Sequence, residues 1–222
     1  IPTKTLLYSA KLLDYAKGAG KYGISVPEGV GFDMEKMIDR KDKVVKKLTG
    51  GVKMTVQSYG AELVEKEAII EGESNGNIRI VAGGEVYEVT YLLVCTGSET
   101  VIPPIKGLSE LDYWTSKEAL ESTSLPQSLA IIGGGVIGME FASFYNSMGV
   151  KVSVIEMMPE ILGAMDKETS AMLRTEYQKR GIKFYLGSKV TEVGGAGVTI
   201  EKEGKSSVVA ADKILVSVGR KA

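Results

Sequence analysis

The residues best suited to chemistry are the glycines of Gly133-Gly134-Gly135-Val136-Ile137-Gly138, which follow an apolar run from Ser128 and lead into a helical pattern. This order predicts a strand, a tight turn and the start of a helix. Gly133 would allow the turn, Gly135 would let a pyrophosphate approach backbone N–H groups, and Gly138 would let the helix pack close to its strand. The positive N-terminus of the helix would favour the anion.

A carboxylate completes this pattern. A second strand is predicted from Lys151 to Ile155, and Glu156 follows it, close to the roughly 20-residue offset of an acid that binds the ribose of a dinucleotide. A carboxylate here accepts hydrogen bonds from ribose hydroxyls and repels a 2′-phosphate, which favours NAD over NADP. The alternatives are an ordinary tight turn for the glycines and a solvated strand end for Glu156.

Composition excludes several classes of function. The chain of 222 residues carries 27 basic and 28 acidic side chains without a basic block, so nothing draws it to nucleic acid or an anionic membrane. It shows no membrane-spanning run and no signal peptide, which makes the cytoplasm the default expectation. One cysteine and no histidine exclude an intramolecular disulfide, Ser-His or Cys-His catalysis and a zinc site built on imidazole, so no metal is expected.

Helical spacing dominates the N-terminal part. One helix is predicted over Thr3–Lys17, and a second begins after Asp33 as N-cap and keeps its apolar phase to Val56. Gly50-Gly51 interrupts this second pattern at a cost of about 1 kcal/mol per glycine, so a break at Gly50 is the alternative to one long helix.

The next segment changes to β character. Short runs around residues 63–89, separated by glycine turns, predict an antiparallel meander. Tyr91–Gly97 reads as a buried strand that ends in a glycine loop, within which Cys95 would pack as a small hydrophobe. A connector from Pro103 follows, with a helix-capping signal at Ser116.

From Ser128 strands and helices alternate, which predicts an α/β fold with a parallel, doubly wound sheet. The expected order is a strand, a helix to Met148, a strand to Glu156, a helix over 166–180, a strand over 182–186, short β runs over 190–209 and a strand over 213–218. The two halves end alike, in LLVCTGSE and ILVSVGRK. We therefore expect two Rossmann-like dinucleotide-binding units, each with a parallel sheet and a small antiparallel β-meander, divided into residues 1–124 and 125–222.

Five segments give the chain a family resemblance: IPTKTLL at 1–7, CTGSETVIPPIKG at 95–107, LPQSLAIIGGGVIGMEFA at 125–142, VKVSVIE at 150–156 and DKILVSVGRKA at 212–222. In these segments the chain resembles the flavin-dependent, class I pyridine nucleotide-disulfide oxidoreductases, and within them the dihydrolipoyl dehydrogenases. The resemblance implies that residues 1–124 are the central part of an FAD-binding domain and that residues 125–222 are an NAD-binding domain.

The resemblance also implies which residues meet the cofactors. Those matching FAD-contacting positions are Lys4, Gly60, Thr96, Gly97 and Ser98. Those matching NAD-contacting positions are Gly133, Gly134, Gly135, Val136, Ile137, Gly138, Met139, Glu140, Glu156, Val190 and Gly219. A Lys4–Glu140 ion pair would tune the flavin where it meets the nicotinamide. A helix C-cap for Gly60, a core position for Val190 and a turn for Gly219 are the alternatives.

The implied reaction passes electrons from dihydrolipoamide through a disulfide and FAD to NAD+. In the family a cysteine directly precedes the Ile-Pro-Thr-Lys segment, so the redox cysteine would lie one position before Ile1, and a His-Glu acid-base pair comes from a dimerisation domain. These groups are not in the 222 residues, so the chain alone is expected to be inactive. The expected partners are a lipoyl-bearing protein of a 2-oxoacid dehydrogenase or glycine-cleavage complex and, for the full-length parent, a second copy. Mercuric reductase-like or NADH oxidase-like enzymes and a non-catalytic NAD-binding module are the alternatives.

Overall fold

The computed structural model describes residues 1–27 and 29–222, which divide into two units. Residues 1–45 and 99–221 form the first unit, and residues 46–98 with Ala222 form the second. The helices are α1 (Pro2–Gly18), η1 (Ala19–Tyr22), α2 (Met34–Ser58), η2 (Leu108–Glu110), α3 (Ser116–Glu121), α4 (Val136–Ser147) and α5 (Lys167–Lys179). The strands are β1 (Ala68–Ser74), β2 (Asn77–Ala82), β3 (Glu85–Val89), β4 (Glu99–Thr100), β5 (Ser128–Ile132), β6 (Lys151–Glu156), β7 (Lys183–Leu186), β8 (Lys189–Gly194), β9 (Gly197–Lys202), β10 (Lys205–Val209), β11 (Lys213–Val216) and β12 (Arg220–Lys221).

A four-stranded parallel sheet forms the centre of the first unit. Its order is β11-β5-β6-β7, so the parallel strands, numbered along the chain, lie as 3-2-1-4 when read from β7. The chain therefore moves outward from β5 through β6 to β7 and then returns, through β8-β9-β10, to add β11 on the other side of β5. Open sheets bind ligands beyond the carboxyl ends of the strands at such a switch point, which here lies between β5 and β11.

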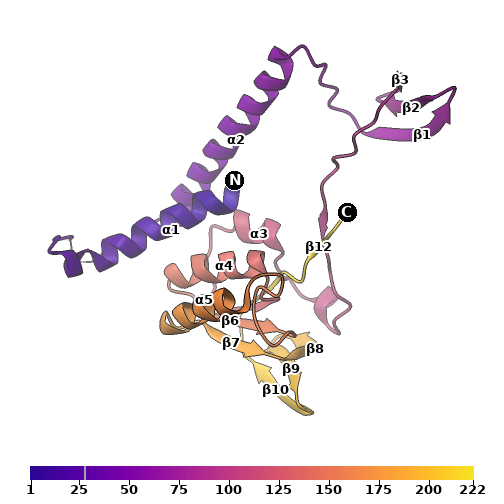
Figure 1. Cartoon of the computed structure of the whole chain (residues 1–222). Helices are drawn as coiled ribbons and strands as arrows, with labels where there is room; N and C mark the ends of the chain where they lie inside the picture. Colours follow the sequence, from indigo (N-terminus) through magenta and orange to yellow (C-terminus); the bar gives the residue numbers. More distant parts are fainter. Residues whose placement is uncertain (28) are drawn as a thin grey trace. The chain divides into compact units, whose positions relative to one another are not determined.

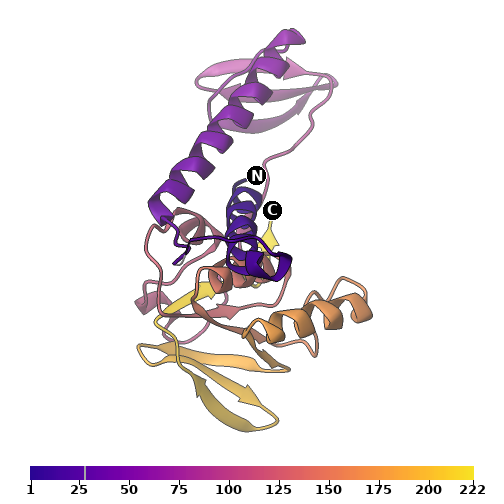
Figure 2. The same ribbon diagram turned by 90° about the vertical axis from the view of Figure 1, so that its left-hand side faces the viewer.

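Both faces of the sheet are covered, as the alternation along β5 requires. Leu129 and Ile131 face one core with the aromatic side chains of α4, whereas Ala130 and Ile132 face a second core with the antiparallel meander β8-β9-β10. Figures 1 and 2 both show α4 and the meander on opposite sides of the sheet. Strands buried on both faces read as continuous apolar runs, which is why SLAII carries so little polarity.

Helix α1 belongs to the same core. Its buried residues Leu6, Ala10 and Leu13 pack in the cluster that includes α4, and the two helices lie side by side in Figure 1. Hydrogen bonds also connect the C-terminal parts of α1 and α4, because Ser147 and Arg180 both donate to Asp14 Oδ2 at 2.8 Å. The chain's first helix is thereby fixed against the helix that follows the glycine turn.

The expected helices are confirmed with small shifts. Helix α2 runs unbroken through Gly50-Gly51, and Asp33 accepts a hydrogen bond from the Lys36 N–H at 3.0 Å, as an N-cap does. Asp166 caps α5 by accepting from Thr169 at 2.9 Å. The N-cap of α3 is Thr115 rather than Ser116, and it forms a capping box with Glu118.

The second unit contains the antiparallel sheet β1-β2-β3, as the glycine turns predict. Leu63 and Val64, expected to be β, lie outside any strand. Gly60, with a φ of 77°, donates its N–H to the Gln57 carbonyl just beyond α2, which is the geometry of a helix C-cap.

The prediction of a buried strand over Tyr91–Gly97 is wrong. The segment forms no strand, Tyr91 and Leu93 are 90% and 86% exposed, and Cys95 is exposed rather than packed. A buried parallel strand requires hydrogen-bonding neighbours, and the described residues provide none beside this segment. The first half of the chain thus contributes a meander but no parallel sheet, and within the described residues the parallel sheet of the second half stands alone. No described helix combines the length and the apolar character needed to cross a bilayer.

Candidate dinucleotide site

A cavity of about 860 Å³ opens at the carboxyl ends of the parallel strands. It is reached by the ends of β5 and β6 and by the residues that follow β7 and β11, so it lies at the switch point between β5 and β11. Its lining residues are Pro103, Pro104, Ile105, Ile132, Gly133, Gly135, Val136, Ile137, Ile155, Glu156, Met157, Met158, Ser188, Lys189, Val190, Ser217, Val218, Gly219 and Arg220. Its volume falls within the roughly 300–1,000 Å³ of small-molecule sites.

The glycine turn is packed against β11 so closely that two of its positions exclude a side chain. Gly133 has a φ of 108°, and a Cβ there would lie 2.5 Å from the Ser217 carbonyl oxygen. A Cβ on Gly138 would lie 2.2 Å from the Gly133 carbonyl oxygen. The Ser217 hydroxyl donates to that same Gly133 oxygen at 3.1 Å, so the residue directly after β11 helps to hold the turn. These contacts explain why the turn requires glycine at both positions.

The start of α4 presents unpaired donors to the cavity. Gly133 donates its N–H to Ile155 O at 2.9 Å and Met139 donates to Gly135 O, but the N–H groups of Gly135, Val136 and Ile137 have no acceptor in the described part of the chain. Gly135 lines the cavity and has open space where a Cβ would project. Unpaired N–H groups at a helix N-terminus form a site for an anion, and a bare glycine lets that anion approach.

Glu156 lies across the turn with its carboxylate directed at the backbone of the turn. Oε2 accepts from the Gly134 N–H at 2.6 Å, and Oε1 accepts from the Met158 N–H at 2.8 Å. A Cβ on Gly134 would lie 3.1 Å from Glu156 Oε2, so this glycine allows the close approach. A carboxylate has about four acceptor positions, so one that holds two N–H donors still accepts from hydroxyl groups in the cavity.

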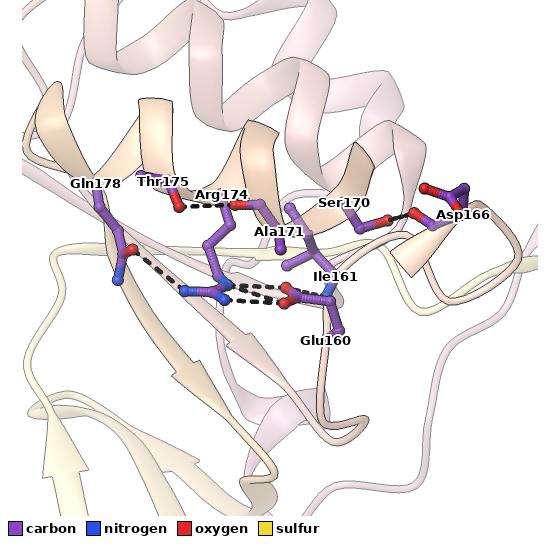
Figure 3. Close-up of polar contacts among 8 residues, drawn as sticks. All are labelled: Glu160, Ile161, Asp166, Ser170, Ala171, Arg174, Thr175 and Gln178. Carbon is purple, nitrogen blue, oxygen red and sulfur yellow. Dashed lines mark hydrogen bonds and ion pairs between the residues drawn. The ribbon is translucent and has the colours of Figure 1, made fainter. Parts of the chain in front are cut away.

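The loop between β6 and α5 closes one side of the turn and is anchored by an ion pair. Leu162 donates its N–H to Gly134 O at 2.9 Å. Two residues earlier, Glu160 receives Arg174 of α5 in a two-pronged contact, with Nε to Oε1 at 2.8 Å and Nη2 to Oε2 at 2.9 Å (Figure 3). Hydrogen bonding from Arg174 holds the pKa of Glu160 below its usual range. The ion pair therefore ties the loop that touches Gly134 to α5.

The expected ion pair between α1 and α4 is present. Lys4 Nζ lies 2.5 Å from Glu140 Oε1, with the Lys4 side chain largely exposed and that of Glu140 mostly covered. The hydrogen bond from Lys4 to Glu140 raises the pKa of Lys4, so this amine stays protonated over the physiological range. The pair joins the two predicted cofactor portions of the chain by one direct contact.

The predicted dinucleotide residues divide into two groups. Those that line the cavity are Gly133, Gly135, Val136, Ile137, Glu156, Val190 and Gly219. Gly134, Gly138 and Met139 support the turn from behind, and Glu140 faces Lys4. The predicted flavin residues Gly60, Thr96, Gly97 and Ser98 belong to the second unit, and their contact with flavin stays a prediction.

Several lining residues were not among the predicted cofactor contacts. Pro103–Ile105 reaches the cavity because β4 pairs with β12, which brings the connector back beside the end of β11. Ser188 lies in the loop after β7, and Lys189 and Arg220 are the first residues of β8 and β12, which follow β7 and β11 in the chain. The loops that follow the parallel strands of this sheet all lie at the same edge. The predicted strand ends at Leu186 and Val218 were therefore the sequence signal that could have identified these lining residues.

Comparison with known proteins assigns the family. A model of the pyridine nucleotide-disulphide oxidoreductases matches residues 1–222, the whole chain. The chain belongs to this family. The resemblance read from the sequence motifs is thereby confirmed, and FAD and NAD are the cofactors that the family uses.

Individual relatives agree with this assignment. The chain is 38% identical over 226 residues to a dihydrolipoyl dehydrogenase of Acholeplasma laidlawii, covering 100% of this chain and 66% of that protein. The HOCl-induced flavoprotein disulfide reductase RclA of Escherichia coli superposes with a TM-score of 0.76 at 26% identity, covering 100% of this chain and 46% of RclA. LpdA of Mycobacterium tuberculosis superposes with a TM-score of 0.83 at 22% identity, covering 99% and 49%, which shows the shared fold.

The chain thus spans between about half and two thirds of the length of these relatives. The Rossmann-type α/β fold expected from the motifs is confirmed by the parallel sheet and by these structures.

Proposed function

We propose that this chain binds NAD(H) at the cavity between β5 and β11 and forms the NAD-binding and part of the FAD-binding portion of a dihydrolipoyl dehydrogenase. The parent reaction is the oxidation of dihydrolipoamide by NAD+. The observation that carries the proposal is the combination of unpaired N–H groups at the start of α4 with the Glu156 carboxylate across one cavity. The sequence identity of 38% to a dihydrolipoyl dehydrogenase supports the choice of dihydrolipoamide as the substrate.

The residues of the cavity fit a dinucleotide. The diphosphate is placed at the N–H groups of Gly135, Val136 and Ile137, where the helix dipole favours negative charge. Glu156 is placed at the adenosine ribose hydroxyls. When bound, NAD+ supplies the hydride acceptor, and the chain's own task is to hold and orient the dinucleotide.

Specificity for NAD over NADP follows from the negative charge of Glu156. We expect NAD+ to bind the isolated chain at least about tenfold more tightly than NADP+ in calorimetric titrations, because a 2′-phosphate would meet this carboxylate. Glu156→Gln removes the charge at constant size and should narrow that ratio. Glu201→Gln, on an exposed position of β9 outside the cavity, removes the same charge and should leave the ratio unchanged. Equal affinity for NAD+ and NADP+ in the unmodified chain would overturn the assignment.

The Lys4–Glu140 pair is proposed to act where flavin and nicotinamide meet. A protonated amine neutralised by a carboxylate gives the flavin environment a fixed dipole, which influences flavin electronics more than folding. Gly60, Thr96, Gly97 and Ser98 are proposed as further flavin contacts. The domain division at residues 124 and 125 is part of this proposal, as is a cytoplasmic location.

The isolated chain is proposed to lack turnover. Its 222 residues contain one cysteine and no histidine, so they provide neither a redox cysteine pair nor a histidine base. In the parent enzyme we place a lipoyl-bearing protein of a 2-oxoacid dehydrogenase or glycine-cleavage complex as partner, and a homodimer as the assembly. NADH formation from dihydrolipoamide, measured with the purified chain, FAD and NAD+, should equal the rate without protein. Sustained NADH formation would show that the chain holds the full catalytic machinery.

A further inference from the structure

Two neighbouring methionines, Met157 and Met158, line the cavity directly after Glu156. Their exposed fractions are 66% and 52%, so solvent reaches both side chains. The backbone of Met158 is held on both sides, because its N–H donates to Glu156 Oε1 at 2.8 Å and its carbonyl accepts from the Gly187 N–H at 3.0 Å. The backbone of Met158 is therefore held beside the carboxylate, while both thioethers remain accessible to solvent.

We propose that Met157 and Met158 are an oxidation-sensitive site, at which hydrogen peroxide or a similar two-electron oxidant lowers the affinity for NAD(H). The proposal rests on the proposed dinucleotide site. With the adenosine ribose at Glu156, the adenine lies next to the residues that follow Glu156 in the chain. Thioether sulfur makes favourable contacts with aromatic rings, so the two methionines form an apolar, polarizable surface for the base.

The chemistry needs only the oxidant. The thioether sulfur gives up two electrons, the O–O bond of hydrogen peroxide breaks, one oxygen forms an S–O bond and the other leaves as water. The product, methionine sulfoxide, is polar and chiral, and enzymatic reduction restores the thioether. Loss of the sulfur–aromatic contact should raise the Kd for NAD+ by roughly 2- to 10-fold.

The chain contains its own comparison residues. Met54 and Met172 are 68% and 65% exposed, as open to solvent as Met157, but neither lines the cavity. Met139 is 3% exposed and should resist oxidation in the folded chain. Because Met54 and Met172 are similarly exposed but lie outside the cavity, they distinguish a change in NAD+ affinity caused by oxidation at the site from a general effect of oxidation.

The first experiment maps oxidation by peptide mass spectrometry after peroxide treatment with and without saturating NAD+. Bound NAD+ should slow oxidation of Met157 and Met158 by several-fold and leave Met54 and Met172 unchanged. Equal rates at all four residues with NAD+ bound would overturn the placement. If NAD+ does not bind the untreated chain, the proposed function itself fails, which is a different outcome from binding without protection.

The second experiment measures the Kd for NAD+ before and after peroxide has fully oxidised Met157 and Met158. All proteins carry Cys95→Ser, because the exposed thiol would also react. For each protein, the Kd after oxidation is compared with the Kd of the same protein before oxidation. The Kd should rise in the Cys95→Ser chain and in its Met54→Leu/Met172→Leu variant. It should stay constant in the Met157→Leu/Met158→Leu variant. Methionine sulfoxide reductases should reverse the rise. An unchanged Kd after full oxidation, or an equal rise in Met157→Leu/Met158→Leu, would overturn the proposal.

Discussion

Because Gly138 has no side chain, helix α4 can pack closely against the glycine turn and the residue that follows β11. A Cβ at this position would lie 2.2 Å from the Gly133 carbonyl oxygen and 2.8 Å from the Ser217 hydroxyl, and the first of these is backbone that cannot rotate away. Gly138→Ala must therefore move α4 relative to β5, which costs roughly 1–3 kcal/mol of overpacking strain. Thermal unfolding followed by circular dichroism should show a clear fall in the melting temperature, and NAD+ affinity should fall with it.

Gly135 is the matched control, because its hydrogen faces open space within the cavity. Its backbone has a φ of −73°, which alanine adopts without strain. Gly135→Ala should unfold at the same temperature as the unmodified chain but bind NAD+ about tenfold or more weakly, because the methyl group occupies the approach to the N–H groups. Loss of stability with intact affinity would place the dinucleotide elsewhere.

At the scale of elements, the loop from β6 to α5 depends on the Glu160–Arg174 pair. The pKa of Glu160 is lowered in the folded chain, so unfolding releases a group that binds protons more readily. The stabilisation is therefore present above the ordinary pKa of a glutamate and is lost as pH falls through the lowered value. For a pair with side chains 22% and 25% exposed, removal should cost about 0.5–1 kcal/mol at neutral pH.

Glu160→Gln tests this assignment through denaturant unfolding at a series of pH values. The difference in unfolding free energy from the unmodified chain should be largest near neutral pH and vanish in acid, where both proteins lack the charge. Glu176→Gln is the control, because Glu176 forms an exposed ion pair with Lys179 on the same helix and should change little. A constant difference across the pH series would mean that packing, and not charge, accounts for the contribution of Glu160.

Some secondary-structure elements of the site could be predicted from local sequence patterns, and others could not. SLAII, the glycine turn and VKVSVIE carry their own strand, turn and acid signals, and they fold as expected with Glu156 beside Gly134. Local spacing also places α1, α2 and α5, because a helix forms its hydrogen bonds internally. Pro103–Ile105 and Ser217 join the site through the pairing of β4 with β12 and through the close packing of β11, and no local pattern encodes such long-range contacts.

For the whole molecule, the segment Tyr91–Gly97 is where the sequence prediction of a buried strand fails, and the reason is general. Its apolar residues are typical of a strand buried on both faces, but a strand forms only where neighbours supply N–H and C=O partners. The described residues supply none there, and Tyr91 and Leu93 remain exposed in an extended segment. The residue types of a segment show that it could form a buried strand. They do not show whether neighbouring strands are present to pair with it.

This exposure predicts limited proteolysis at one place. Chymotrypsin binds extended chain and cuts after large apolar residues, so the earliest cuts should follow Tyr91 or Leu93. Tyr22 and Tyr59 are 82% and 87% exposed, but Tyr22 lies within η1 and Tyr59 directly after α2. In Tyr91→Ser/Leu93→Ser the first cut should disappear while other sites keep their rates. First cuts at Tyr22 or Tyr59 in the unmodified chain would show that the segment is covered.

The nicked chain should stay together, because the cut separates two parts of one core. Residues 1–45 and 99–221 form a single unit, in which Leu6, Ala10 and Leu13 of α1 are buried in the same cluster as α4 and the parallel sheet. Side chains buried this way contribute roughly 1.5–3 kcal/mol each for leucine, enough to hold α1 without a covalent link. Gel filtration should therefore give one peak that splits only in denaturant, with NAD+ affinity preserved. Separation of the fragments in native buffer would mean that α1 adds little to the core, and that the Lys4–Glu140 contact depends on the intact backbone.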